Sequence, residues 1–475
     1  MTMKRLLIFL SFFAFGANML QAQGVHEQST IYEYPTDPLV RAKLDKWQDN
    51  KFGMIIHWGI YAVPGIVESW SICNEDWIGR DSTTTYDAYK RNYWAYSEQF
   101  NPVDFNPDQW AEAAKDAGMN YVVFTTKHHD GFCMWDTKET DFSIAKGPFK
   151  NNPKADVTKH VFDAFRKQNF MIGAYFSKPD WHCQYYWWDK YATADRNNNY
   201  DIHKNPWRWN KFKEFTFNQI SELMHNYGSV DILWLDGGWV RPRETVNAEV
   251  LSWGAPIPEW SQDIDMAKIA AMGREVQPGM LVVDRTVHGP FENYQTPEQK
   301  VPQTQLPHPW ESCITLGYAW SHVPNERYKS THWVIHTLTE ITAKGGSLLL
   351  GVGPTPQGLL RPEAIERLKE VGKWTSKNGK AIYGTRITPV YNDDKTWFTQ
   401  SKDGKTIYAI TCLTEKEPIP TSVEWQGNEP AKGGKIVLLQ TGKSVKWEKK
   451  GGKIIVTIPK NLPNDLPALA FEFKK

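Results

Sequence analysis

Short, continuously apolar runs alternate along this chain with longer stretches in which apolar residues recur at helical spacing. The apolar runs lie at residues 52–56, 121–124, 171–176, 230–236, 280–285 and 347–351. Strands that are apolar throughout are buried on both faces, which is typical of a parallel sheet covered by helices. The pattern therefore predicts repeated strand–helix units.

The stretches between the apolar runs carry helix signals. The first has Asn106 as a candidate N-cap, Pro107 at the first helical position and Gly118 as a stop. Further helices are predicted at residues 157–165, 209–225, 265–276, 331–343 and 362–376. Their number and the chain length favour a (β/α)8-like TIM barrel in which about seven strands are recognisable and one element is irregular. No GxGxxG follows the first strand, which is evidence against a dinucleotide-binding fold.

The pattern changes near residue 385. Short alternating runs, such as 405–410 and 454–458, are separated by Asp-Gly, Gly-Gly and Asn-Asp pairs. Alternation between turn signals predicts an all-β sandwich. We therefore expect a catalytic barrel at residues 23–384 and a C-terminal β-sandwich at 385–475.

The first residues have the pattern of an export signal. Lys4 and Arg5 precede an apolar core at 6–17, and small residues near Ala22 resemble a cleavage site. The core is short for a membrane span, and no cysteine follows it as in a lipoprotein. We expect a signal peptide at 1–22 and a periplasmic or extracellular protein without membrane insertion.

The composition indicates which classes of binding partner and which kinds of site to expect. The 55 basic and 54 acidic residues leave a net charge of +1, so there is no electrostatic signature of nucleic-acid binding. The five cysteines are scattered without a CxxC pair, so we expect free, buried thiols rather than a disulfide framework or a zinc site. The 23 tryptophans favour carbohydrate binding, although a large barrel also buries many aromatic residues. Nothing in the sequence indicates an oligomeric state.

Polar residues recur where the predicted strands end. In a barrel of parallel strands these ends meet at one rim, where reactive groups lie. Asp236 ends an apolar strand just before Gly237, and a buried carboxylate is costly unless it is paired or used, although an Asp also commonly starts a turn. Trp234 points to the same side of that strand. The strand-end residues are His57, His128, His129, Tyr175, Asp236 and Arg285.

This set of side chains suits a neutral ligand rich in hydroxyl groups, because neutral histidine offers both a donor and an acceptor. Two other interpretations remain for the pair of His128 and His129. One of them can be a core histidine, or the pair can bind a metal. No HExxH helix accompanies the pair, so we expect neither a metal nor a cofactor.

Three segments resemble the motifs of glycoside hydrolase family 29, the α-L-fucosidases. They are MIIHWG at 54–59, TKHHDGF at 126–132 and DILWLDG at 231–237, in the family's order, and the resemblance covers most of residues 35–380. It implies a (β/α)8-like barrel followed by a β-sandwich. It also implies an exo-acting, retaining α-L-fucosidase that releases terminal L-fucose from fucosylated glycans through a covalent fucosyl-enzyme intermediate. Retaining hydrolysis needs two carboxyl groups roughly 5–5.5 Å apart.

The resemblance assigns the nucleophile to Asp236. Glu292, Glu298 and Glu311 are candidates for the acid/base, and we choose Glu298 because residues 293–298 resemble the family's acid/base loop. Glu311 is the alternative candidate for the acid/base. Its other interpretation is a structural carboxylate at the next strand. By the same resemblance the fucose pocket is lined by His57, Glu68, Trp70, His128, His129, Tyr175, Trp234 and Arg285. An extra serine separates Glu68 from Trp70.

Two regions bear on specificity. Residues 180–209 are rich in tryptophan and form either a platform for further sugars or packing beneath a long loop. The insertion after Trp239 and the segment 296–299 favour the branch of the family that cleaves α-1,3/1,4-linked fucose. Two other functions stay open at this point, a fucose-binding protein without catalysis and a barrel glycosidase acting on galactose-like sugars.

Overall fold

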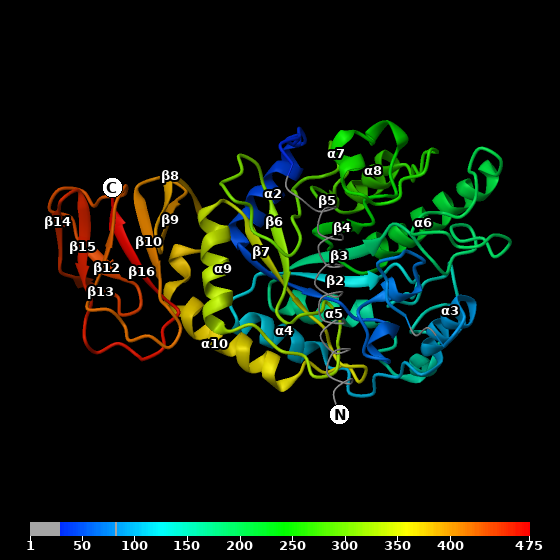
Figure 1. Cartoon of the computed structure of the whole chain (residues 1–475), viewed down its shortest axis with the longest axis horizontal. Helices are drawn as coiled ribbons and strands as arrows, with labels where there is room; N and C mark the ends of the chain where they lie inside the picture. Colours follow the sequence, from blue (N-terminus) through cyan, green and yellow to red (C-terminus); the bar gives the residue numbers. More distant parts are fainter. Residues whose placement is uncertain (1–28, 81–82) are drawn as a thin grey trace, which may run out of the picture.

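The computed structural model describes residues 29–80 and 83–475. A larger lobe is built around a parallel sheet with helices around it, and a smaller lobe of antiparallel strands carries the C-terminus (Figure 1). The predicted signal peptide at 1–22 lies outside the described residues. Among the residues that the structure describes, no helix combines the length and the apolar character needed to cross a bilayer.

The parallel sheet has seven strands in the order β5-β4-β3-β2-β1-β7-β6, and every neighbouring pair is parallel. The predicted fold class is confirmed, because strands alternate with helices along the chain and the sheet curls as in a TIM barrel. The strands are β1 (Phe52–Ile56), β2 (Tyr121–Lys127), β3 (Met171–Ser177), β4 (Ile232–Asp236), β5 (Leu281–Asp284), β6 (Glu311–Thr315) and β7 (Ser347–Val352).

An irregular segment at residues 292–299 takes the place of an eighth strand. The amide of Asn293 donates to Val282 of β5 at 2.9 Å, and the amide of Gln299 donates to Cys313 of β6 at 2.9 Å. Glu298 also forms an isolated parallel bridge with Cys313. Because this segment forms backbone hydrogen bonds with both edge strands, it closes the sheet. The same bonds fix the position of Glu298 along β6, opposite Cys313.

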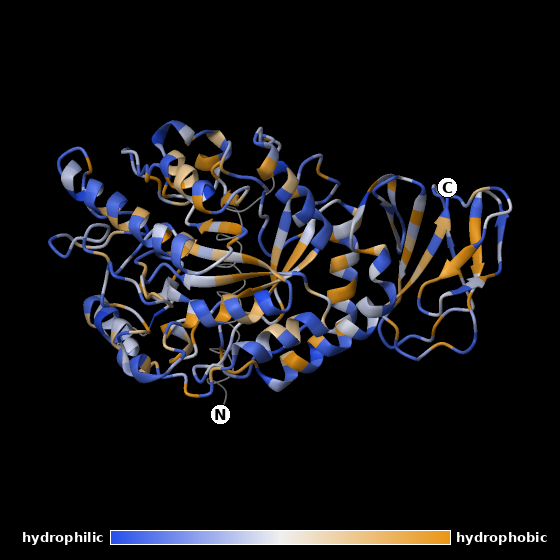
Figure 2. Ribbon diagram, turned by 180° about the vertical axis from the view of Figure 1, so that it is seen from behind, coloured by the Kyte–Doolittle hydropathy of each residue, from blue (hydrophilic) through white to orange (hydrophobic). Residues whose placement is uncertain are grey.

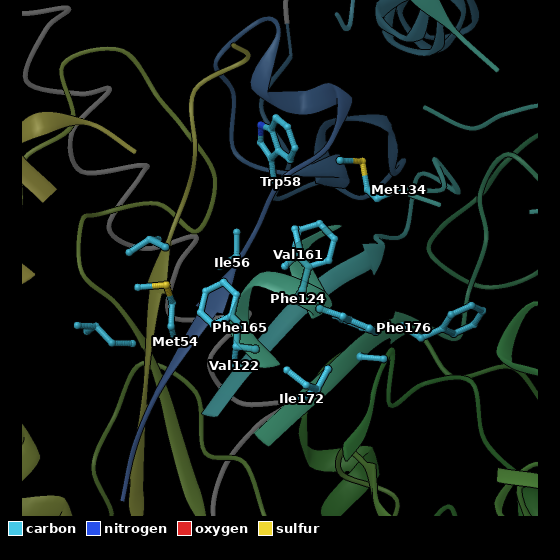
Figure 3. Packing of buried hydrophobic residues seen from close by; sticks show 14 of the residues in the cluster. Met54, Ile56, Trp58, Val122, Phe124, Met134, Val161, Phe165, Ile172 and Phe176 are labelled. Carbon is cyan, nitrogen blue, oxygen red and sulfur yellow. The ribbon is translucent and has the colours of Figure 1, made fainter. Parts of the chain in front are cut away.

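Side chains alternate between the two faces of the strands, as the pleat requires. One face forms the barrel interior, where Tyr121, Tyr175 and Trp234 pack in a single cluster with Trp47 of α2 (Pro38–Asn50). The other face packs against helices. Figure 3 shows this second set around α5 (Val157–Lys167), with labels on Met54, Ile56, Trp58, Val122, Phe124, Met134, Val161, Phe165, Ile172 and Phe176.

The predicted helices are present, and the first of them has the expected N-cap and stop residues. The side chain of Asn106 accepts a hydrogen bond from the amide of Gln109, Pro107 begins α4 (Pro107–Asp116), and Gly118 adopts a φ of +88° after its end. Hydrophobic residues concentrate on the strands and on the helix sides that face them (Figure 2). The remaining helices are α3 (Tyr86–Trp94), α6 (Pro206–Asn226), α7 (Ala248–Ser252), α8 (Met266–Val276), α9 (Thr331–Ala343) and α10 (Pro362–Asn378).

Residues from 385 onward form two antiparallel sheets. The three-stranded sheet, in the order β11-β15-β14, and the six-stranded sheet, in the order β13-β12-β16-β10-β9-β8, share one hydrophobic cluster, in which Trp425 stacks on Phe473. The C-terminal region is therefore all-β, as predicted. Its strands are β8 (Thr385–Asp393), β9 (Thr396–Ser401), β10 (Thr406–Cys412), β11 (Ser422–Trp425), β12 (Ile436–Leu438), β13 (Lys443–Val445), β14 (Trp447–Lys450), β15 (Lys453–Thr457) and β16 (Ala468–Lys474).

The five cysteines are all free, as expected. Four of them are buried and Cys183 is partly buried.

Candidate active site

Every predicted site residue lines one pocket at the C-terminal ends of the parallel strands. The pocket encloses about 640 Å³, including solvent at its mouth. Its walls are formed by Ile55, His57, Glu68, Trp70, Trp77, His128, His129, Tyr175, Arg196, Trp234, Asp236, Trp239, Arg285, Glu298, Cys313 and Trp320.

Asp236 is held by donors on both carboxylate oxygens. Oδ2 accepts a hydrogen bond of 2.8 Å from the hydroxyl of Tyr175, and Oδ1 accepts from Nη1 of Arg285 at 2.9 Å and from the amide of Gly237 at 2.8 Å. Gly237 has a φ of +92°, and a Cβ there would lie 2.3 Å from Pro179, so the turn requires glycine. The turn explains only the bond from Gly237, whereas the other two donors orient the carboxylate toward the pocket.

Arg285 connects Asp236 to Glu298. Its Nη2 donates to Oε2 of Glu298 at 2.9 Å, and its Nε donates to Thr296 at 2.9 Å. Its guanidinium lies 4.3 Å from the ring centre of Trp234. The side chain of Arg285 is 2% exposed, that of Asp236 12% and that of Glu298 23%, so Glu298 lies nearer to solvent. A group leaving from the substrate can therefore depart past Glu298.

The other two candidate carboxyls do not line the pocket. Glu311 is the first residue of β6 and is fully buried beneath the pocket, where it accepts hydrogen bonds from Tyr121 at 2.7 Å and from Trp234 at 3.1 Å. Burial raises the pKa of Glu311 to about 7. Glu292 accepts from the amide of Thr286 at 3.0 Å and lies 2.6 Å from Nδ1 of His288. Of the three carboxyls, only Glu298 can reach a ligand in the pocket.

Three histidines form one wall of the pocket, and burial keeps them neutral. It lowers the pKa of His128 to about 4 and, together with the neighbouring His128, holds the pKa values of His57 and His129 well below the ordinary range. Nδ1 of His128 lies 2.5 Å from Ser69, and Nδ1 of His129 lies 2.7 Å from Ser177. These bonds orient both rings and leave their Nε2 atoms for a ligand.

The extra serine between Glu68 and Trp70 does not displace either residue from the pocket. Ser69 begins a short 3-10 helix (Ser69–Ile72), and it is the residue that contacts His128. Burial and then the charge of Glu298 raise the pKa of Glu68 to about 8, and Oε1 of Glu68 is buried without a hydrogen-bond partner in the described structure. Glu68 therefore offers a protonated carboxyl group to a ligand at neutral pH.

The buried aromatic residues of the tryptophan-rich segment at 180–209 pack against one another and against the pocket wall. Trp181 is buried 5.1 Å from His129, and Trp187 stacks on Trp181. Farther along, Tyr191 and Trp207 are exposed. The first half of the segment therefore supports the pocket, while its outer aromatic residues face solvent.

Six residues that line the pocket were not predicted from the sequence, namely Ile55, Trp77, Arg196, Trp239, Cys313 and Trp320. Trp239 follows Asp236 by three positions, so its closeness to Asp236 in the sequence could have identified it as a pocket residue. Trp320 donates to Oε1 of Glu298 at 3.2 Å, but it lies on a loop after β6 with no motif around it. Arg196 likewise has no motif around it in the sequence that would predict a place in the pocket.

His128, His129 and Asp236 offer ligand atoms within 4.8 Å of one another, as a metal site would. The chemistry around Asp236 does not fit a cation. Arg285 already places a positive charge 2.9 Å from Oδ1, and Tyr175 occupies Oδ2. Neutral hydroxyl groups suit these side chains better.

Comparisons with known proteins agree with this geometry. The family model described as Alpha-L-fucosidase matches residues 19–380. The tissue alpha-L-fucosidase of Macaca fascicularis is 28% identical over 480 residues, covering 94% of this chain and 92% of the relative. Alpha-L-fucosidase isoenzyme 1 from Paenibacillus thiaminolyticus has a TM-score of 0.72 at 28% identity, covering 92% of this chain and all of that one. The alpha-fucosidase of Thermotoga maritima in complex with fucose has a TM-score of 0.70 at 26% identity, covering 93% of this chain and all of that one.

Proposed function

Because the chain belongs to the α-L-fucosidase family and is a glycoside hydrolase, we propose that it acts as an exo-enzyme releasing terminal L-fucose from fucosylated glycans with retained configuration. The observation that supports this most directly is the bridge through Arg285. It brings Asp236 and Glu298 together in one pocket, on either side of the same guanidinium. A protein that only binds fucose has no need for such a pair.

In the first step the carboxylate of Asp236 attacks the anomeric carbon. Glu298 donates its proton to the glycosidic oxygen as the bond between that oxygen and the anomeric carbon breaks. Tyr175 and Arg285 hold Asp236 in its attacking position throughout. The products of this step are the free aglycone and a fucosyl ester of Asp236.

In the second step the carboxylate of Glu298 takes a proton from water as the water oxygen attacks the anomeric carbon. The ester bond breaks and its electron pair returns to Asp236. Glu298 is protonated again, so both groups are ready for another cycle. Two inversions at one carbon give net retention.

The rest of the pocket supplies hydrogen bonds to the sugar. Neutral imidazoles of His57, His128 and His129 can donate or accept, according to their tautomer. Trp70 lies edge-to-face with His129 at 5.2 Å and gives the sugar an apolar surface. These groups are compatible with galactose-like sugars too, so the choice of sugar has to be tested directly.

We also propose that the enzyme favours α-1,3/1,4-linked fucose on branched glycans and that it is exported. The linkage proposal is supported by the insertion after Trp239 and by the segment 296–299, which carries Glu298. Export is supported by the charge and hydropathy pattern of residues 1–22.

The test is a panel of aryl glycosides followed by labelling of the nucleophile. The α-L-fucoside should be cleaved and the galactosides should not. A 2-fluoro-fucosyl fluoride should label a peptide containing Asp236, and a label on any other residue would overturn the nucleophile assignment. Tight fucose binding without turnover of any fucoside, aryl or oligosaccharide, would favour a binding protein.

Linkage is tested with defined oligosaccharides. Lewis-type trisaccharides should be cleaved faster than 2′-fucosylated ones. Equal or faster cleavage of the 2′-linked sugar would contradict the linkage proposal and leave the fucosidase proposal intact.

A further inference from the structure

Arg196 reaches the pocket from the tryptophan-rich segment at 180–209 and not from the end of a parallel strand. Its Nε donates to Oε1 of Glu75 at 2.7 Å, and its Nη2 donates to Oε2 of Glu75 at 2.6 Å. Both side chains are more than nine-tenths buried. The carbonyl of Arg196 accepts hydrogen bonds from Trp181 and Tyr186, so the backbone is held in place as well.

Two tryptophans of the pocket wall enclose the guanidinium. It lies 4.9 Å from the ring centre of Trp70 and 5.1 Å from that of Trp239. Both rings also contact His129, at 5.2 Å each. Arg196 therefore lies on the side of Asp236 that faces His129, whereas Arg285 and Glu298 lie on the other side, near Oδ1.

The bonding of Arg196 leaves one nitrogen for a ligand. Glu75 engages Nε and Nη2, while within residues 29–80 and 83–475 no acceptor is bonded to Nη1. A guanidinium fixed by a carboxylate and two aromatic faces loses little conformational entropy on donating a further bond. Because Glu75 balances its charge, the pair suits a neutral acceptor such as a hydroxyl group better than an anionic ester.

We propose that Nη1 of Arg196 donates a hydrogen bond to the 2- or 3-hydroxyl of the fucosyl unit and thereby helps to determine sugar specificity. The inference rests on the proposed function, because it places the anomeric carbon between Asp236 and Glu298. The aglycone then leaves past Glu298, and the sugar ring extends toward His129. The ring edge that carries C2 and C3 offers hydroxyls to the guanidinium, whereas the C5 methyl edge offers none.

The experiment compares one enzyme variant with a series of substrates. Leaving Glu75 buried without its partner would destabilise the protein, so the variant is the double substitution R196M/E75Q. Its kcat/KM is measured on an aryl α-L-fucoside and on the 2-deoxy, 3-deoxy and 4-deoxy analogues. We expect a loss of about 10- to 100-fold on the parent fucoside, the usual effect of removing a hydrogen bond from a charged donor. The variant and the wild type should be nearly equal on either the 2-deoxy or the 3-deoxy analogue.

Two further variants keep the result interpretable if the double variant folds poorly. R196K retains the charge beside Glu75 but loses the planar fork, and it should show the same dependence on the substrate. R208M removes a guanidinium that stacks on Trp188 in the same segment, at 3.8 Å, and that does not line the pocket, so its kcat/KM should be unchanged. Thermal unfolding of each variant reports its folding.

The proposal is overturned if the loss is equal on all four sugars, if it disappears only on the 4-deoxy analogue, or if there is no loss. An equal loss would mean that Arg196 acts only by supporting Trp70 and Trp239. Failure of the proposed function looks different, because the wild type would then not cleave the parent fucoside at all.

Discussion

Arg285 binds Asp236 by a hydrogen bond of 2.9 Å from Nη1 to Oδ1, and the same guanidinium binds Glu298 through Nη2. The proposed nucleophile and the proposed acid/base are thus positioned by one side chain. That side chain is itself fixed by Thr296 and by the ring of Trp234. A displacement of Arg285 would therefore move both groups at once.

Replacing Arg285 with lysine should reduce kcat on an aryl fucoside by about 100-fold, the cost of a misplacement on the order of 1 Å. Lysine keeps the positive charge but cannot hold two carboxylates with a planar fork. Steady-state kinetics of Arg285→Lys and of the control Thr296→Val, which loses only the acceptor for Nε, provide the measurement. A normal kcat in Arg285→Lys would show that charge alone is sufficient.

Asp236→Ala should lower kcat by roughly 10⁴-fold or more, because no other described carboxylate is placed to form the covalent intermediate. Added azide should restore turnover by attacking the face that Asp236 vacates. The product should then be the fucosyl azide of inverted configuration, which NMR identifies. Formation of the retained azide instead would assign the nucleophile to another residue.

Glu298→Ala should affect substrates according to their leaving groups. Natural oligosaccharides should slow by about 10²- to 10⁴-fold, because their leaving oxygen needs a proton in the transition state, whereas an activated aryl fucoside should be largely spared in its first step. Azide should accelerate breakdown of the intermediate with retained configuration. The alkaline limb of the pH–rate profile should also disappear.

The same measurements on Glu311→Ala separate the two acid/base candidates. Glu311 lies beneath the pocket and holds Trp234, so its removal should not produce a dependence on the leaving group. Near-normal cleavage of oligosaccharides by Glu298→Ala, together with that dependence in Glu311→Ala, would reverse the assignment.

Glu311→Gln should change how stability depends on pH. The pKa of Glu311 is about 7 in the folded protein, above its ordinary value of 4.5, so the folded state binds the proton more tightly. The resulting stabilisation is fully present below pH 4.5 and is lost as the pH rises through 7, a change on the order of 3 kcal/mol. Glutamine is neutral throughout and should not show this loss. Urea unfolding between pH 4 and 8 gives the difference in the free energy of unfolding, and a constant difference between variant and wild type would contradict the expectation.

Chelation of divalent metals should leave activity unchanged. Arg285 supplies a positive charge beside Asp236, so the arrangement of His128, His129 and Asp236 does not favour a cation. Activity after EDTA treatment and dialysis is the measurement. A loss that one particular divalent metal restores would show that the cluster binds that metal.

The sequence alone determined six of the seven parallel strands (β6 was not among the predicted runs), the main helices between them and most of the polar groups around the pocket. This was possible because apolar periodicity is local, and because the ends of parallel strands necessarily meet at one rim. His57, Tyr175, Asp236 and Arg285 could be assigned to one site without any knowledge of their contacts. Recognisable motifs around Asp236 and the His128–His129 pair then narrowed the chemistry to a sugar hydrolase.

Only the tertiary structure decided which side chains from irregular segments enter the pocket. Glu292, Glu298 and Glu311 are close in sequence, yet of the three only Glu298 lines the site. The bonds of the segment 292–299 to both edge strands place Glu298 in the pocket and Glu292 outside it, whereas Glu311 begins β6 and is buried beneath the pocket. Arg196 is placed by Glu75, 121 positions away in the chain. Such placements depend on packing between distant segments, and no local pattern of polar and apolar residues encodes them.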